Sequence, residues 1–139
     1  MSRDGRSELS AQTALARGRT AAQALLVDAV TVTRPGTATT DDLTGAVTNT
    51  PTTIYTGSAK VQQAAAMGQR VDAGETSTIL LRLEVHLPVV GSENVRRGDL
   101  VTVTASVNDA TLVGRKFRVH DEQYKSFATA RRLGVEEVT

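Results

Sequence analysis

The sequence predicts a mainly β fold, a small antiparallel β-barrel or sandwich of six to seven strands, with an N-terminal α-helix and two long loops. Several short segments alternate apolar and polar residues, which is typical of strands with one buried face. Thr, Val and Ile, which favour strands, make up 39 of the 139 residues. The length fits one domain, so we expect residues 1–139 to form a single unit.

The composition limits the classes of function that fit the chain. Without cysteine there are no disulfides and no thiolate chemistry. The net charge of +1 is unlike that of a protein that binds nucleic acid through counterion release. No apolar run approaches the roughly 18–20 residues of a membrane helix, and residues 1–6 lack the apolar stretch of a signal peptide. We therefore expect a soluble intracellular protein whose thin aliphatic core is completed by other subunits.

Residues 7–29 are predicted to form the helix, after a flexible N-terminus at 1–6. Ser7 is the candidate N-cap. One face carries small or apolar residues at helical spacing, namely Ala11, Leu15, Gly18, Ala22, Leu25 and Ala29. Because most of these side chains are small, we expect the helix to approach a flat surface closely.

The first half of the remaining chain, 30–138, alternates strands with two loops. Val30 and Val32 begin a strand that ends at Pro35. Residues 36–53 are predicted to be a long mobile loop, with a candidate hairpin turn at Asp42–Gly45. Strand character returns at 54–61, with a β-bulge expected at Gly57. Residues 63–76 are predicted to be the second long loop.

The second half carries the clearest strands. Residues 79–87 alternate without interruption, placing Glu84 and His86 on the polar face. In the next strand the inward residues are expected to be Val101, Val103, Ala105 and Val107. In the strand after it, Phe117 and Val119 should point inward, and Lys116, Arg118 and His120 outward. Residues 124–138 are expected to add one or two strands, with an irregularity at Gly134.

A search for an active site gives little. Glu84 and His86 could share a metal, but they lack a further ligand pair at a recognisable spacing, so an exposed surface histidine is the expectation. The neighbouring carboxylates of Asp41-Asp42 and of Glu136-Glu137 should point in opposite directions. The tripeptide 97–99 (Arg-Gly-Asp) should be an ordinary turn. We predict no enzymatic activity, no cofactor and no metal.

A small barrel that binds single-stranded nucleic acid is an alternative from another class. Such a surface needs aromatic side chains interleaved with basic ones, and Tyr124 and Phe127 lie in a partly basic stretch. Alternation places Phe117 opposite Lys116 and Arg118, however, so we expect Phe117 in the core.

The order of features from about residue 9 to 138 resembles the small head–tail connector proteins of long-tailed bacteriophages, the head-completion or stopper group. The phrases that carry the resemblance are VTVTRPG at 30–36, IYTGSAKVQ at 54–62, RGDLVTV at 97–103, DATLVGRKFRV at 109–119 and KSFATARRL at 125–133. The tail terminator and other tail-completion ring proteins are the alternative within this resemblance.

The resemblance implies a structural protein of the virion neck. Its members form a homo-oligomeric ring, commonly of twelve copies, between the portal-side adaptor and the tail terminator or tail-tube proteins. Such a ring completes the head, lets double-stranded DNA pass and in some members closes the channel. The expected location is the virion, and the host cytoplasm during assembly. Near-neutral charge suits a channel wall, because dense positive charge would grip the DNA.

The two loops are the candidate contact segments. We expect 63–76 to face the lumen or the next ring, through Ala64, Ala65, Ala66, Met67, Gln69 and Arg70. The candidate inter-ring residues of 36–53 are Asp41, Asp42, Leu43 and Thr44. Both loops being disordered until assembly is the alternative. Copy number, and whether the ring gates DNA or only bridges its neighbours, stay open at this level.

Overall fold

The computed structural model describes residues 3–73 and 76–138, with side chains for 9–63 and 83–138. The elements in chain order are α1 (Arg3–Ala24), β1 (Asp28–Arg34), β2 (Ala38–Thr40), β3 (Val47–Asn49), β4 (Thr52–Ala73), β5 (Thr76–Leu87), β6 (Leu100–Ser106), the 3₁₀ turn η1 (Ala110–Leu112), β7 (Lys116–Glu122) and β8 (Arg131–Val138).

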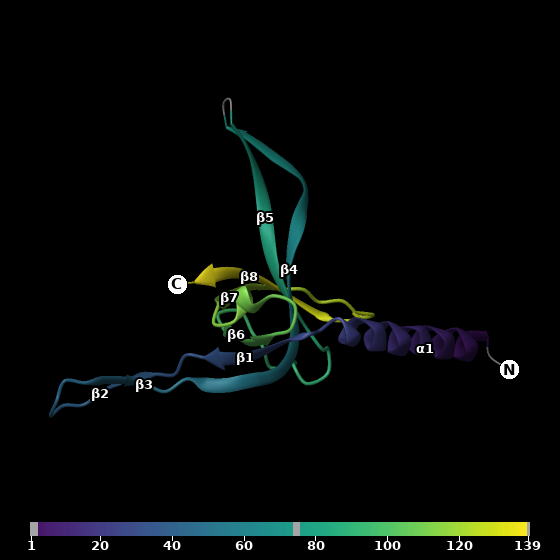
Figure 1. Ribbon diagram of the computed structural model, residues 1–139. Helices are drawn as coiled ribbons and strands as arrows, with labels where there is room; N and C mark the ends of the chain where they lie inside the picture. Colours follow the sequence, from purple (N-terminus) through teal and green to yellow (C-terminus); the bar gives the residue numbers. More distant parts are fainter. Residues whose placement is uncertain (1–2, 74–75, 139) are drawn as a thin grey trace.

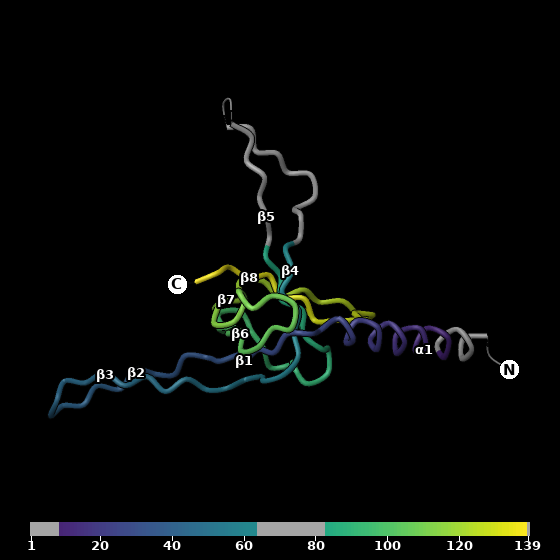
Figure 2. The backbone as a smooth tube through the Cα atoms, in the orientation of Figure 1, coloured from purple at the N-terminus to yellow at the C-terminus, as the bar shows by residue number. Residues whose placement is uncertain are grey.

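Six antiparallel strands close into a barrel in the order β1-β4-β5-β8-β7-β6, with β6 pairing back onto β1. The barrel predicted from the alternating pattern is therefore confirmed. β2 and β3 form a separate two-stranded hairpin. In Figure 1, α1 and the β2–β3 hairpin leave the barrel on opposite sides, and the backbone trace of Figure 2 shows the same arrangement.

The core of the barrel is almost entirely aliphatic. Its one aromatic member among the described side chains is Phe117, which is 2% exposed. The predicted inward residues Val101, Val103 and Val119 are also buried. The other members of the core are Val30, Val32, Ala59, Val85, Leu87, Val95, Leu133 and Val135. Burying these methyl groups is the main favourable contribution to folding.

The helix ends five residues before its predicted end and begins before Ser7. The amides of Leu25 and Leu26 donate to carbonyls three residues back, which tightens the last turn, and Asp28 already belongs to β1. The physical reason is that 28–33 pair with both β4 and β6, which outweighs the helical spacing of Ala29. Residues 3–6, expected to be flexible, belong to α1.

Two bulges lie at positions other than those predicted. In the β1–β4 ladder Val32 pairs with Tyr55 and Thr33 with Thr53, so the extra residue is Ile54 and not Gly57. In β6 the extra residue is Thr104, because Ala29 pairs with Ala105 and Val30 with Val103.

This second bulge reverses the alternation beyond Thr104. Ala105 and Val107 are therefore exposed, although the pattern predicted them inward. Ser106 is turned instead toward Asp28, whose carboxylate accepts its hydroxyl at 2.7 Å. One inserted residue thus decides which side chains of β6 reach the core.

The C-terminal segment holds one strand, β8, preceded by a loop at 123–130 that contacts the helix. Its irregularity lies opposite Gly134, where His120 is the extra residue of β7. A Cβ on Gly18 would lie 2.8 Å from Thr129 Cγ2, so the glycine permits close approach. Arg19 Nε donates to the carbonyl of Ala128 at 3.1 Å. At Gly18 the small-residue face approaches a loop closely, and not the flat surface that was expected.

The second predicted loop, 63–76, is mostly strand. Residues 60–65 and 70–73 of β4 pair with β5, with a register shift between Ala65 and Arg70. The backbone of the candidate lumen residues Ala64–Arg70 therefore belongs to β4. Their side chains lie outside the described residues. Alanine-rich composition misled the prediction, because strand pairing with β5 overrides a weak local preference.

Candidate functional site

The β2–β3 hairpin, with its flanks at 36–50, belongs apart from Gly36 to the longest fully exposed run among the residues whose side chains the structure describes, and we call it the arm. Every residue from 37 to 53 is exposed. At its base a Cβ on Gly36 would lie 2.1 Å from the Thr50 carbonyl oxygen, so glycine lets the two ends of the arm meet. The predicted mobile loop is thus a paired hairpin, with its turn where the sequence suggested.

The turn of the arm is held by its own polar groups. The Asp41 amide donates to the Ala46 carbonyl at 2.8 Å, and the Gly45 amide donates to the Asp41 carbonyl at 2.7 Å. The Leu43 amide donates to Asp41 Oδ1 at 2.9 Å, and this bond, with a contribution from Thr44, lowers the pKa of Asp41. Asp41 therefore stays ionised at neutral pH while it shapes the turn.

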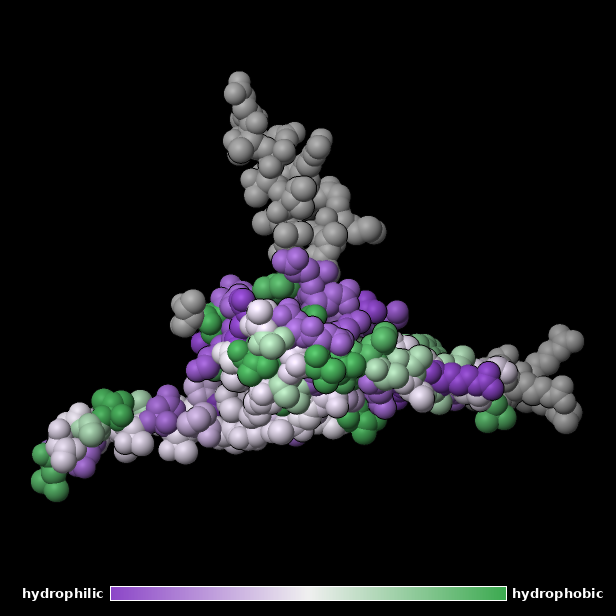
Figure 3. Space-filling model, viewed as in Figure 1, coloured by the Kyte–Doolittle hydropathy of each residue, from purple (hydrophilic) through white to green (hydrophobic). Residues whose placement is uncertain are grey.

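The tip of the arm, Asp41–Gly45, presents charge and an apolar side chain together. Leu43 is 95% exposed, and Val47 beside the tip is 67% exposed. Figure 3 shows apolar surface at the outer end of the arm, well away from the barrel. Asp41 and Asp42 are the only charged residues from 35 to 59, so the arm carries a charge of −2. The four predicted contact residues, 41–44, are thus gathered at one exposed point.

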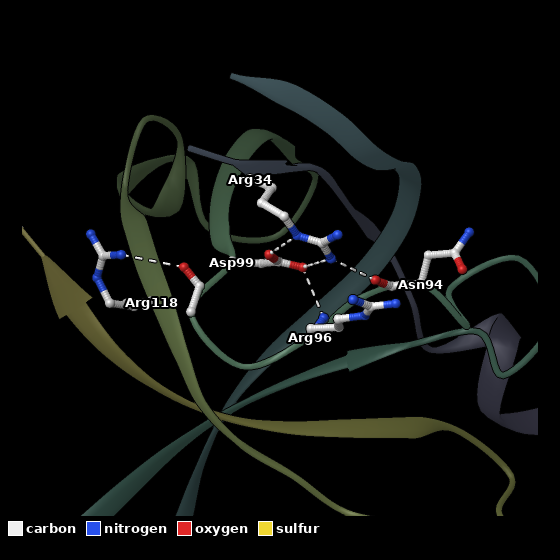
Figure 4. Close-up of polar contacts among 6 residues, drawn as sticks. Arg34, Asn94, Arg96, Asp99 and Arg118 are labelled. Atoms are coloured by element: carbon white, nitrogen blue, oxygen red, sulfur yellow. Dashed lines mark hydrogen bonds and ion pairs between the residues drawn. The ribbon is translucent and has the colours of Figure 1, made fainter. Parts of the chain in front are cut away.

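An ion pair between the partly exposed Arg34 and the buried carboxylate of Asp99 holds the chain where the arm begins. Arg34, the last residue of β1, donates from Nε and Nη2 to the two carboxylate oxygens of Asp99 at 2.9 and 3.1 Å (Figure 4). The Arg96 amide adds a bond of 2.8 Å to the same carboxylate, and Arg34 Nη2 also donates to the Asn94 carbonyl at 2.9 Å. The carboxylate of Asp99 raises the pKa of Arg34.

The burial of Asp99 also bears on whether the tripeptide 97–99 is a structural turn. Asp99 is 1% exposed and all its carboxylate bonds are internal. Gly98 has φ +95°, and its carbonyl accepts a bond from Arg118 Nη1 at 3.3 Å. The tripeptide is a structural turn, as predicted. Sequence reasoning missed the Arg34–Asp99 pair, because nothing local shows that the two residues meet across the sheet.

A groove of about 410 Å³ lies at the base of the arm, and we call it the basal groove. Pro35 and Pro51 line one side, and β6 and β7 line the other. The two charged groups in its lining are Lys116 and Arg118, which the alternation correctly predicted to point outward. The remaining lining residues are Thr33, Asn49, Leu100 and Thr102. The surface is a shallow, partly apolar groove with a charge of +2.

Glu84 and His86 share the polar face of β5, as predicted, but His86 is not exposed. It is 7% exposed and its Nε2 lies 3.0 Å from Glu84 Oε2. Burial lowers the pKa of His86, and Lys60 and Arg132 lower it further, while the bond with Glu84 opposes the shift. Ala22 near the end of α1, and Leu25 and Leu26 in the turn that follows it, line the same hollow.

This pair does not form a metal site with other described residues. Among the side chains described, no group of three His, Cys, Asp or Glu residues is placed to hold an ion. Besides His86, Glu84 has Gln123 as a partner, whose Nε2 donates to Glu84 Oε1 at 3.4 Å. Glu84 and His86 therefore form a buried polar contact at the junction of α1 with the barrel.

The aromatic residues of the partly basic stretch are divided between the core and the surface. Phe117 is buried, as predicted, while Tyr124 and Phe127 are exposed on the loop at 123–130. Arg115, which precedes β7, is paired with Glu137 at 2.8 Å. In the part of the chain that the structure describes, no helix is long and apolar enough to cross a membrane.

Comparison with known proteins adds a family but no function. Residues 18–136 match the model of DUF6093, which is described as a family of unknown function. No curated protein and no solved structure matches the chain. The matched region contains the barrel except for the last two residues of β8, together with the arm and the end of α1. The chain therefore belongs to the DUF6093 family, a family of unknown function.

Proposed function

We propose that this chain is a structural subunit of a bacteriophage neck ring that completes the head between the portal-side adaptor and the tail. The order of the sequence phrases from 30 to 133 suggests this role. The observation that carries the proposal furthest is the contrast between a closed barrel and an arm that is exposed along its whole length. A subunit of this shape offers a rigid body and a separate contact element.

The surfaces on the two sides of the barrel support repeated side-by-side contact. α1 and the arm leave the barrel in opposite directions (Figure 1). On the helix side, Leu25 is 59% and Val27 41% exposed, and on the arm side Leu43 is exposed. Different apolar surfaces on opposite sides suit head-to-tail contacts, which close into a ring when the rotation between copies is right.

The charge of the chain supports contact with passing DNA without tight binding. With a net charge of +1, the chain has little capacity for counterion release along a duplex. The segment 63–76 remains the proposed lumen-facing element, now as part of the β4–β5 hairpin. A cryo-EM map of an assembled neck tests this assignment, and density for 63–76 on the outer surface would contradict it.

The test of the proposed function is removal of the gene from a phage that encodes it. We expect filled heads that lose their DNA, together with free tails, in negative-stain images of the lysate. Restoring the gene on a plasmid should restore complete particles. A plasmid that carries the Leu43→Ala variant tests the exposed tip of the arm in the same assay. Normal particles without the protein would overturn the proposal.

The single-stranded nucleic-acid alternative makes a different prediction. It requires a salt-sensitive affinity for oligonucleotides. That affinity should fall in the Tyr124→Ala variant, since Tyr124 is exposed. Tyr55→Phe, on the barrel, is the control. Phe117→Ala would not discriminate, because Phe117 is buried and its loss would damage the core. We expect no measurable binding at physiological salt and no change in Tyr124→Ala.

A further inference from the structure

The tip of the arm and the basal groove are complementary in charge and in character. The tip carries the carboxylates of Asp41 and Asp42 beside the exposed side chain of Leu43. The groove carries Lys116 and Arg118 beside the apolar surfaces of Pro35, Pro51 and Leu100. We propose that the tip of one copy of this chain binds the basal groove of the next copy. The proposal rests on the proposed ring and names the contact that would build it.

The two surfaces cannot meet within one molecule. The groove lies at the base of the arm, and eight residues separate Pro35 from Leu43. At about 3.3 Å per residue, the paired strands hold the tip about 25 Å from the groove. The contact therefore joins two molecules. In the proposed ring each tip binds the copy ahead and each groove receives the tip of the copy behind, so the contact is heterologous and builds rings or open chains, whereas two arms exchanged between the same two copies would close a dimer.

The charges on the two surfaces are available for such a contact. The Asp41 carboxylate shapes the turn, so Asp42 is the carboxylate free to face outward. In the groove, Arg118 already donates to the Gly98 carbonyl. Glu136 on β8 is also the cross-strand neighbour of Arg118, and it is not part of the groove lining. Lys116 lies opposite Val138 and is exposed, so it is the better partner for Asp42.

A second copy fits the tip better than a protein of an adjoining ring, because this chain itself carries the complementary surface. The contact is small, and a stable interface needs about 1,000 Å² or more. We therefore expect weak association of the isolated chain that is strengthened when many contacts close together. Because the pair Asp42–Lys116 is exposed, salt should weaken the association.

The absence of native cysteine allows a direct test by disulfide trapping. Leu43→Cys in the tip is combined with Thr102→Cys in the groove, and the purified chain is oxidised mildly. We expect a ladder of oligomers on non-reducing gels. The matched control combines Leu43→Cys with Val107→Cys, since Val107 is just beyond β6 and 81% exposed but is outside the groove. The control should give a much weaker ladder at the same protein concentration, because its second cysteine lies outside the groove and meets the tip only by random collision.

A charge exchange tests the same contact without cysteine. Asp42→Lys and Lys116→Glu each place like charges at the contact, and each should weaken association on the order of tenfold in sedimentation velocity at low salt. An equal mixture of the two variants should recover it, because each tip then meets a groove of opposite charge. Lys125→Glu, on the loop at 123–130, is the matched control and should behave like the unchanged chain.

Four results would overturn the inference, and the first three concern the purified chain. They are equal ladders from the groove and control cysteine pairs, no recovery in the mixture, and no association of the chain at about 1 mM. A tip cysteine that crosslinks only to a different protein in an infected-cell extract would also overturn it. If the cysteine pair of tip and groove gives the ladder but purified particles lack the chain, the neck proposal fails and the contact between copies stands. If particles contain the chain and the trap fails, only the inference fails.

Discussion

The barrel and the arm differ in how their apolar residues are placed and in how they are stabilised. Both contain many threonines, but the arm has a single valine, Val47. In the barrel, valines such as Val30 and Val101 are completely buried, and the Arg34–Asp99 pair ties a loop to β1. In the arm, Val47 and Leu43 are exposed, and the turn is held by local bonds to Asp41. A lone two-stranded hairpin is marginally stable in water. The difference teaches that the barrel buries its own apolar side chains, whereas the arm leaves its described apolar side chains exposed, and our proposal is that a neighbouring copy covers them.

The largest expected effect comes from making the same substitution in both regions. Leu133→Ala, in the core, should lower the free energy of unfolding by about 2–5 kcal/mol, because it removes buried methyl groups and leaves a cavity. Leu43→Ala, at the tip, should change it by less than about 0.5 kcal/mol. Urea unfolding followed by circular dichroism measures both. Similar losses in the two variants would show that the arm packs onto the subunit.

The buried carboxylate at the base of the arm should have the next largest effect. Asp99→Asn keeps the shape but places an amide group among donors from Arg34 and Arg96, so stability should fall by about 2 kcal/mol. Arg97→Gln, an exposed neighbour, is the control and should stay within about 0.5 kcal/mol. An unchanged midpoint for Asp99→Asn would mean that the pair does not anchor the loop at 92–99.

Removing the arm should separate folding from association. Because Gly36 and Thr50 lie side by side, replacing residues 37–49 with a short glycine linker leaves the ends where they are. We expect the unfolding free energy to change by no more than about 1 kcal/mol, since the segment buries little surface. Sedimentation velocity should show loss of self-association. A variant that fails to fold would contradict the independence of the barrel.

The smallest effect concerns pH. Burial holds the pKa of His86 in the folded chain below that of the unfolded chain, although the bond with Glu84 opposes this shift. The unfolded state therefore binds the proton first, and stability should fall as the pH drops from about 7 through 6.5, the ordinary value for histidine, toward the folded pKa. His86→Gln should reduce this slope between pH 7 and 5, and His120→Gln, which is exposed, should not. Equal slopes in all three proteins would exclude His86 as the cause.

The predictable part of the fold came from alternation, and the errors came from features that local sequence does not encode. Phe117 and Val119 reached the core as expected, because β7 is regular there. Ala105 did not, because the bulge at Thr104 depends on pairing with β1, which is distant in sequence. The tip residues 41–44 were predictable, since turn residues mark them. The basal groove was not, because it needs β1, β6 and β7 side by side.

The central claim is that this closed barrel is a repeated unit of a phage neck, joined to its neighbours through the arm. The most direct measurement is a cryo-EM reconstruction of the neck of a phage that encodes the chain. The account predicts a ring of six-stranded barrels around the channel, with residues 41–44 of each copy against Lys116 of the next. A neck whose every ring is accounted for by other proteins would contradict it.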